Sequence, residues 1–439
     1  MYCVINKLLQ YCFLVKIRRF EAEKVNAPVK LPFFIAKRIA FNRERTFSRF
    51  IIRIALIATT LSVAVMLLTV ALVNGFQQEI SHKVFDFWGH VHVAPFQPYS
   101  SLLTEDEPFD DSLALRKAIA AQPEVASISE YATRSAILKA NKEIEGVMFK
   151  GVSKSFDWSH LAPYLEKGKE IVFPDSGYAH EIIISRDMAN ELKLKLHDPL
   201  IAYFIQKGST SPRARKLVVG GIYKTSISDY DDTYIIGDIN LLRGVSNWSS
   251  REIGGYEIFL KDYKQMHAFQ ELLYNKILPQ NLSAVSIYEV YTNIFDWLNL
   301  QNMNELIILI IMAVVAVINM VTAILILILE RINMIGVLKS LGMSNWHIRK
   351  VFLFQMGYIT LAGLVIGNIV GLGIAFLQKT TGFFKLDEHT YYMSTAPIKI
   401  EWWQVLAIDA ATLGICVLVL VIPSLIIRKV SPLKAVEFN

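Results

Sequence analysis

The sequence predicts an α-helical membrane protein with four transmembrane helices and a large α+β extracytoplasmic (periplasmic) domain inserted between helices 1 and 2. The chain has 439 residues, of which 53% are hydrophobic and 19% are charged. This is too apolar for an ordinary soluble protein and too charged for a simple bundle of spans. One long apolar run lies near the N-terminus and three lie in the last third, and about 20 helical residues cross the hydrocarbon layer.

The four expected spans divide the chain into ten segments. The first and third spans contain no charged residue, the second contains only Glu305 at its start, with none in 306–329, and the fourth contains Asp409. The spans are residues 54–73, 304–329, 351–377 and 405–427. Between and around them we expect an N-terminal extension at 1–30, a cytoplasmic amphipathic surface helix at 31–53, the inserted domain at 74–303, a cytoplasmic loop at 330–350, a periplasmic loop at 378–404 and a cytoplasmic tail at 428–439.

The distribution of charge predicts the orientation. The net charge is +6, yet acidic residues outnumber basic ones in the inserted domain, and basic residues gather before the first span and at 330–350. The positive-inside rule then places both termini and 330–350 on the cytoplasmic side of the membrane. Because the basic excess lies beside the spans, anionic lipid headgroups are better expected partners than nucleic acid.

The N-terminal region is expected to contribute no signal peptide. In 1–30 the basic residues follow the short apolar stretch, which is the wrong order. We expect a disordered extension, or a start codon assigned too far upstream. The mixture of aromatic and basic residues in 31–53 favours a helix on the inner leaflet, with an ordinary basic flank of span one as the alternative. The inserted domain has no cysteine and therefore no disulfide.

Alternating short patterns predict an α+β inserted domain of two subdomains. The first span is expected to continue past Gly75 as a stalk, since apolar residues keep a helical spacing there, and 288–302 is expected to form a second stalk. Expected helices are 112–121, 185–194 and 261–278, and expected strands are 90–95, 127–138, 145–152, 181–184, 200–204, 217–223 and 255–260. Residues 206–216 suggest a protruding hairpin tip.

The segment 330–352 turns the chain between two spans and is amphipathic. Ile335, Leu338 and Leu341 recur at helical spacing, and Gly342 follows as a cap. We expect a short cytoplasmic helix, suited to pass force from a soluble partner into the membrane.

Motifs that would hold a nucleotide or a metal are missing from the sequence. It has no GxxxxGK[ST], HExxH, GxSxG or CxxC pattern. His82, His90 and His92 are expected to be surface or packing residues rather than a metal site. Asp229, Asp231 and Asp232 are expected to form a solvated turn rather than a catalytic or calcium site. We therefore expect neither a bound cofactor nor a bound metal.

Polar and small residues inside the spans favour helix packing. Asn319, Gln355, Asn368 and Asp409 are expected to make hydrogen bonds between helices, with a cargo or proton path as the alternative. Gly363, Gly367 and Gly371 have the spacing of a close helix contact.

Five stretches carry a resemblance to a known family. They read FIAKRIAFNRERTFSRFI, VNGFQQEI, ILILERINMIGVLKSLGMSNWHIRKVFLFQ, LDEHTYYMSTAPI and VSPLKAVEF. Together with the order of spans they resemble the FtsX/MacB-like ABC transporter permeases, and within these the lipoprotein-releasing LolC/LolE type. The resemblance implies a non-catalytic permease that extracts lipoproteins from the inner membrane toward a periplasmic carrier.

The resemblance also implies partners and site residues. The partners are a LolD-like ATPase dimer that holds ATP and Mg, a second permease protomer, lipoprotein cargo and a periplasmic lipoprotein carrier. The implied ATPase-coupling residues are Arg331, Ile335, Gly336, Leu338, Lys339, Leu341, Gly342 and Ser344. The implied carrier-contact hairpin comprises Ser211, Pro212, Arg213 and Arg215. The implied cargo cleft comprises Met66, Val70, Val73, Phe76, Ile310 and Val314.

Two alternative functions share this architecture. One is an FtsX-like signalling subunit that activates a cell-wall hydrolase. The other is a MacB-like efflux permease, although such exporters commonly carry the ATPase on the same chain, and no phosphate loop is present here.

Overall fold

The computed structural model describes Phe33 and residues 47–97, 105–206 and 211–429. The chain divides into two compact units. The membrane unit comprises residues 1–69, 307–374 and 401–439, and the domain unit comprises residues 70–306 and 375–400. The expected extension at 1–30, most of the expected surface helix at 31–53 and most of the tail lie outside the described residues.

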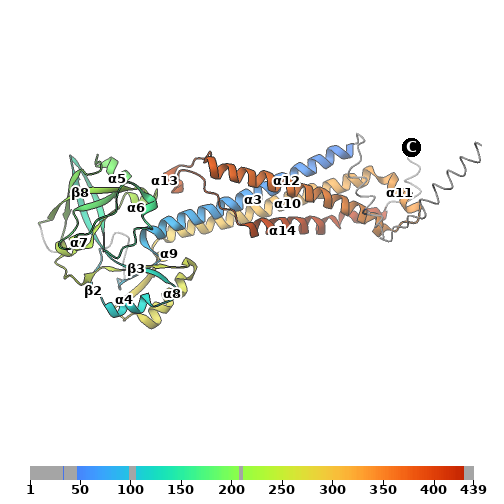
Figure 1. Cartoon of the computed structure of the whole chain (residues 1–439). Coiled ribbons are helices and arrows are strands. Elements are labelled where there is room, and N and C mark those ends of the chain that lie inside the picture. Colours follow the sequence, from blue (N-terminus) through green and yellow to red (C-terminus); the bar gives the residue numbers. More distant parts are fainter. Residues whose placement is uncertain (1–32, 34–46, 98–104, 207–210, 430–439) are drawn as a thin grey trace, which may run out of the picture. The chain divides into compact units, whose positions relative to one another are not determined.

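Long helices make up the membrane unit. Within the described part of the chain, four helices are long and apolar enough to cross a membrane. They are α3 (Phe47–Trp88), α10 (Thr292–Glu330), α12 (Asn345–Thr381) and α14 (Trp402–Leu420), and in this unit they run side by side (Figure 1). A short helix, α11 (Ile332–Ser340), joins α10 to α12, and the 3-10 helix η4 (Pro423–Lys429) follows α14. The fourth candidate span covers Trp402–Ile427 and so reaches the expected residue 427, but its last part is 3-10 helical, because Pro423 cannot continue an α-helix.

The glycines of α12 bring its backbone close to α3, as their spacing predicts. A Cβ atom at Gly363 would lie 2.9 Å from Thr59, and one at Gly367 would lie 2.8 Å from the Val63 side chain and 3.0 Å from a backbone oxygen. A Cβ at Gly371 would lie 3.1 Å from the Ala64 backbone. The contact therefore requires small residues on α12.

One of the hydrogen bonds expected between polar residues of different spans is present. Asn368 on α12 donates from Nδ2 to Oδ2 of Asp409 on α14 at 2.8 Å. This confirms the interhelical hydrogen bond for that pair. Gln355 is buried at 1% exposure, and its amide finds no hydrogen-bond partner among the described residues.

A mixed ten-stranded sheet forms the centre of the domain unit, counted over the described residues. Its main path runs β12-β1-β11-β3-β4-β9-β6-β8-β5, with β7 paired to β3 and β8, and β10 pairs with β2 separately. The strands are β1 (Val91–Pro95), β2 (Phe109–Asp110), β3 (Val125–Ala140), β4 (Glu143–Val152), β5 (Leu165–Gly168), β6 (Glu181–Ser185), β7 (Pro199–Phe204), β8 (Arg213–Tyr223), β9 (Tyr234–Asp238), β10 (Glu252–Ile253), β11 (Gly255–Leu260) and β12 (Leu282–Ser286).

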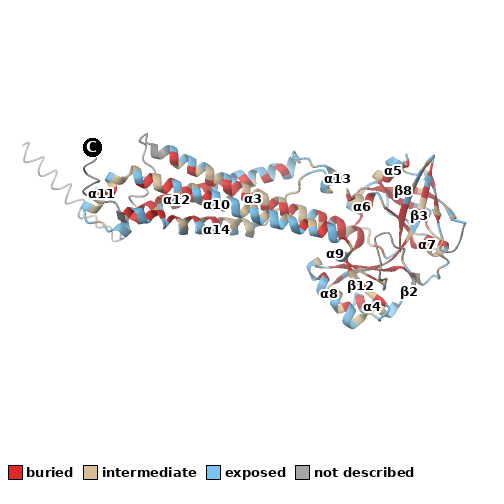
Figure 2. Ribbon diagram, turned by 180° about the vertical axis from the view of Figure 1, so that it is seen from behind, coloured by how far each residue is buried: buried red, intermediate tan, exposed pale blue. Residues whose placement is uncertain are grey.

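Short helices cover the sheet, and the core lies between them and the strands (Figure 2). Helices α4 and α8 pack near β3 and β12, whereas α5 and α7 pack against β6 and β4. The helices are α4 (Leu113–Ala120), η1 (Ala162–Tyr164), α5 (Arg186–Glu191), α6 (Ser228–Asp231), α7 (Ile239–Ser246), η2 (Tyr263–Gln265), α8 (Met266–Leu272), the π-helical η3 (Leu273–Ile277), α9 (Ile287–Val290) and α13 (Glu388–Tyr391).

The expected helices and strands of the inserted domain are present, and both expected stalks are helical. Helix α3 passes through Gly75 to Trp88, and α10 begins at Thr292. Sequence reasoning missed β9 and α7, which follow one another directly. It also placed 206–216 in a hairpin tip, whereas β8 already begins at Arg213, and residues 207–210 lie outside the described residues.

The expected solvated turn at Asp229, Asp231 and Asp232 is wrong for Asp231. This residue is 1% exposed, and its carboxylate accepts hydrogen bonds from the Thr225 backbone at 3.1 Å, the Thr225 hydroxyl at 2.8 Å and the Ser226 backbone at 2.8 Å. Asp231 therefore closes the turn between β8 and α6 from inside, because a buried carboxylate needs such donors.

Candidate functional site

Helix α11 presents a capped, partly exposed surface in the membrane unit. Gly342 has φ +85° and its backbone nitrogen donates to the Lys339 carbonyl at 3.0 Å, while Met343 donates to Leu338 at 3.0 Å. This pair of bonds is a Schellman ending, which favours glycine at the left-handed position. The expected cap at Gly342 is confirmed.

One side of α11 is anchored to the end of the fourth span. Ile335 is fully buried in a cluster that includes Ile427 of η4. Lys339 donates from Nζ to the Ile427 carbonyl at 2.7 Å, and Arg349 donates from Nε to Ser424 Oγ at 3.2 Å. The helix is thus held against η4, so a push on α11 also acts on the C-terminal end of α14.

The eight implied coupling residues fall into three classes of burial. Ile335 and Gly336 are buried and hold the helix in place, whereas Leu341 is 78% exposed. The half-buried members are Arg331, Leu338 and Lys339, and the other exposed members are Gly342 and Ser344. The exposed end of α11 and the turn after it form the surface available to a partner.

The implied carrier-contact hairpin is formed by β7 and β8, with Phe204 opposite Arg213. Ser211 and Pro212 are exposed, and Arg215 is half-buried. Arg213 is occupied structurally: its guanidinium donates to Asn247 Oδ1 at 2.7 Å and to the Val245 carbonyl at 3.0 Å, at the C-terminal end of α7. A cation at this end of a helix is favourable, so Arg213 fixes the base of the hairpin.

The six residues implied for a cargo cleft differ in exposure. Met66, Val70 and Val73 are buried within the chain, and Phe76 is half-buried. Ile310 and Val314 on α10 are 54% and 50% exposed. They belong to an exposed apolar stripe on α10 that also contains Ile307, Ile311 and Ile318.

Sequence reasoning missed a fully buried ion pair in the domain unit. Lys150 on β4 lies 2.8 Å from Glu257 on β11, and neither side chain is exposed. The Lys150 ammonium also donates to the Phe87 carbonyl at 2.5 Å and lies 4.2 Å from the centre of the Trp88 ring. Burial lowers the pKa of Lys150 and raises that of Glu257, and their mutual attraction opposes both shifts. The pair joins the end of α3 to two strands of the sheet.

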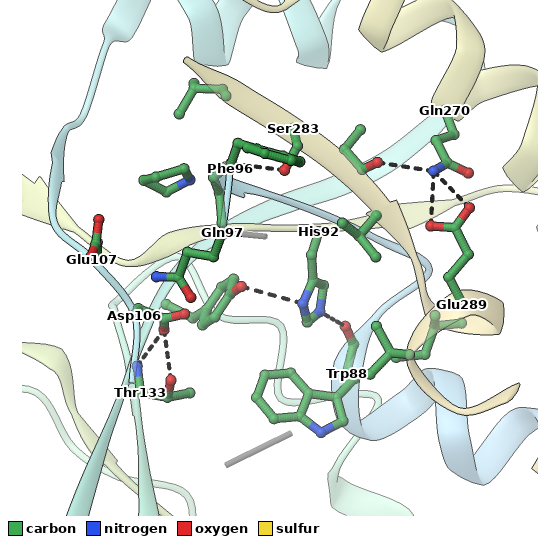
Figure 3. A pocket seen from close by; sticks show the side chains of 18 of the residues that line it. Trp88, His92, Phe96, Gln97, Asp106, Glu107, Thr133, Gln270, Ser283 and Glu289 are labelled. Atoms are coloured by element: carbon green, nitrogen blue, oxygen red, sulfur yellow. Dashed lines mark hydrogen bonds between the residues drawn. The ribbon is translucent and has the colours of Figure 1, made fainter. Parts of the chain in front are cut away.

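A cavity of about 730 Å³ in the domain unit is lined by residues that include Trp88, His92 and Asp106 (Figure 3). His92 bonds to the Trp88 carbonyl at 2.5 Å and to the Tyr131 hydroxyl at 3.3 Å, and burial lowers its pKa to about 4. Asp106 accepts from the Thr133 backbone at 2.6 Å and from its hydroxyl at 2.8 Å, and burial raises its pKa to about 6. These groups bond to one another rather than converging on the open space. Among the described residues, no cluster of His, Cys, Asp or Glu could hold a metal ion.

Two of the stretches that carry the family resemblance contact one another in the domain unit. A Cβ atom at Gly75 would lie 2.4 Å from the Pro397 carbonyl oxygen, and Lys399 donates its backbone N–H to the Ala71 carbonyl at 3.0 Å. The rings of Phe76 and Tyr391 lie 6.3 Å apart. The loop between α12 and α14 therefore packs directly on the stalk, and only glycine at position 75 permits this approach.

Comparison with known proteins gives matches along the chain. The family model of the MacB-like periplasmic core domain matches residues 54–273, and that of the FtsX-like permease C-terminal region matches residues 306–432. The lipoprotein-releasing system transmembrane protein LolC of Neisseria meningitidis is 24% identical, over 90% of this chain and 96% of its own. The LolE protein of Haemophilus influenzae is 20% identical, over 92% and 99%. The periplasmic region of MacB from Actinobacillus actinomycetemcomitans matches with a TM-score of 0.32 and 10% identity, over 46% and 91%.

The first of these models spans half of the chain, and the second covers most of the remainder that is described. The four apolar helices and the α+β domain between the first two agree with both. This chain belongs to the FtsX/MacB-like ABC transporter permeases, and LolC and LolE proteins are among its relatives.

Proposed function

We propose that this chain is the permease subunit of an ATP-driven transporter that extracts lipoproteins from a bacterial inner membrane and releases them toward a periplasmic carrier. The main support is the likeness to lipoprotein-releasing transmembrane proteins over about nine tenths of the chain. In the orientation expected from the basic residues, both termini and α11 lie in the cytoplasm, and the α+β domain lies in the periplasm. The chain itself binds no cofactor, and ATP and Mg belong to a separate ATPase dimer.

The ATPase is proposed to act through the exposed end of α11. Leu341 and the turn at Gly342 provide an apolar contact, and Arg331 and Lys339 add positive charge. Because α11 is bonded to η4, closure of the ATPase would move α10, α12 and α14 together.

Cargo and carrier are proposed to use different parts of the chain. The exposed α10 residues Ile310 and Val314 suit a cleft shared with a second permease protomer, which Met66, Val70, Val73 and Phe76 would join when the helices separate. The β7–β8 hairpin suits the carrier, because Ile205 before its tip is 59% exposed beside the exposed Ser211 and Pro212.

The coupling proposal is tested with Leu341→Asp. Leu341 is 78% exposed, so the change leaves the packing of α11 intact but places a charge in the proposed interface. We expect the variant to insert into the membrane normally and to lose co-purification with the ATPase. The matched control is Ile144→Asp, since Ile144 is 60% exposed on the inserted domain.

Normal ATPase binding by Leu341→Asp would contradict the coupling role of α11. The choice of function is tested separately by what co-purifies with the wild-type chain. An ATPase together with a lipoprotein or its carrier supports lipoprotein release, whereas a cell-wall hydrolase in their place supports the signalling alternative.

A further inference from the structure

The loop between α12 and α14 has an ordered structure of its own. Lys385 and Thr395 form an antiparallel bridge, and the Leu386 backbone donates to the Ser394 carbonyl at 2.9 Å. Gln378, 4% exposed at the end of α12, accepts from the Phe384 backbone at 2.9 Å and donates to the Ala396 carbonyl at 3.0 Å. One buried amide thus closes both ends of the loop.

The tip of this loop is bonded to the inserted domain at several points. Glu388, the first residue of α13, forms an ion pair with Lys224, which follows β8, and lies 3.9 Å from Arg186 of α5. Lys83 of the stalk donates to the Tyr392 carbonyl at 2.9 Å. Met393 is 4% exposed within the main core of the domain. These contacts join the loop to the stalk part of α3, to the end of β8 and to α5.

We propose that residues 382–400 act as a tether that holds the inserted domain, and that Glu388 is its positioning residue. The loop connects α12 to α14, whereas α3 and α10 enter the domain directly. The domain is therefore attached to all four spans. Movement of α12 and α14 reaches it through the Glu388 ion pair. This inference rests on the proposed transport function. If the loop is a tether, the Glu388–Lys224 ion pair is necessary for cargo release.

The charges around Glu388 suit an ion pair that is formed at neutral pH but can still open. Lys224 lowers the pKa of Glu388, mainly through their hydrogen bond, so the carboxylate stays ionised at neutral pH. The Lys224 side chain is 12% exposed and that of Glu388 is 34% exposed. Arg186 is shared between Glu388 and Glu166, which lies 2.6 Å away. When the pair opens, the Glu388 carboxylate can be solvated where it lies, whereas the Lys224 ammonium, at 12% exposure, must move toward solvent.

The experiment compares Glu388→Lys, Lys224→Glu and the double exchange in the full chain with its ATPase. Two readouts are measured: lipoprotein release, and hydrogen exchange of the backbone amides at 386–394. Each single variant places like charges together, so we expect exchange about tenfold faster in this segment and a similar loss of release. The double exchange restores an opposite pair and should recover most of both. Lys154→Glu, at another ion pair of the same domain, is the control and should change neither.

Two results would overturn the tether. One is unchanged exchange at 386–394 in both single variants, which would mean that the pair does not hold the loop. The other is faster exchange with normal release, which would mean that the contact is real but has no positioning role. A wild-type chain that releases no lipoprotein would instead overturn the proposed function, and the exchange data would still decide whether the ion pair holds the loop.

Discussion

Replacing Lys150 with Met should destabilise the inserted domain more than any change at a surface ion pair. Lys150 and Glu257 are both fully buried and 2.8 Å apart. Removal of one partner leaves the other charge in the core, which typically costs about 4 kcal/mol. The change also removes the donor to the Phe87 carbonyl at the end of α3. A loss of this size is a large fraction of the stability of an ordinary domain.

The measurement is thermal unfolding of the purified full chain in detergent, followed by tryptophan fluorescence. For a domain of this size, about 4 kcal/mol lowers the midpoint by about 10 °C. Lys154→Met is the matched control, because Lys154 pairs with Asp175 at 3.1 Å on the surface and should barely move the midpoint. The double variant Lys150→Met with Glu257→Leu should regain part of the loss, since it leaves no unpaired charge in the core.

The reasoning would be refuted if Lys150→Met lowered the midpoint no more than Lys154→Met. It would also be refuted if the double variant were less stable than Lys150→Met alone. In that case the energetic role of Lys150 would lie in its contacts with Phe87 and Trp88 rather than in the pairing of charge.

Two further predictions concern the stalk and the spans. A hydrogen bond to Asp86, at 3.2 Å, raises the pKa of His160. The pair should therefore stabilise the folded domain fully below pH 6.5, and this stabilisation should be lost as the pH rises through the folded-state pKa. The variant His160→Gln should flatten that part of a plot of stability against pH. Gly367→Leu must push α12 away from the α3 backbone at about 1–3 kcal/mol and should lower the unfolding midpoint, whereas Gly373→Leu meets no atom within 4 Å and should not. Equal midpoints for the two glycine variants would contradict the packing of these helices.

The elements that the sequence predicts well are those with a strong local period. The apolar spacing beyond Gly75 is enough to predict that α3 continues as a stalk, even though an isolated glycine weakens a helix. Strand β9 escapes the same reasoning because it is buried along its whole length beside β4 and β6, so it shows no alternation of apolar and polar residues. It also begins three residues after the acidic α6 segment, whose composition suggests a loop.

Features that depend on contacts between distant residues could not be predicted from the sequence. Lys150 lies in a strand, where a charged residue ordinarily faces solvent, and nothing nearby in the sequence indicates its partner Glu257. Asp231 is a different case, because its donors, Thr225 and Ser226, are close in the sequence, and the polar composition of the segment instead suggests a solvated turn. Helix α11, in contrast, is predicted correctly from the sequence, because its apolar period and the glycine after it are both local signals.

Two of the stretches that carry the family resemblance have a common physical reason in the structure. VNGFQQEI lies on the stalk and LDEHTYYMSTAPI forms the loop, and the Pro397 carbonyl approaches Gly75 too closely for any side chain at that position. A larger residue at 75 would leave the helix intact, since helical backbone accepts alanine or leucine readily. It would, however, push the loop off the stalk and separate Glu388 from Lys224. The glycine is therefore explained by what packs against the helix and not by the conformation of the helix itself.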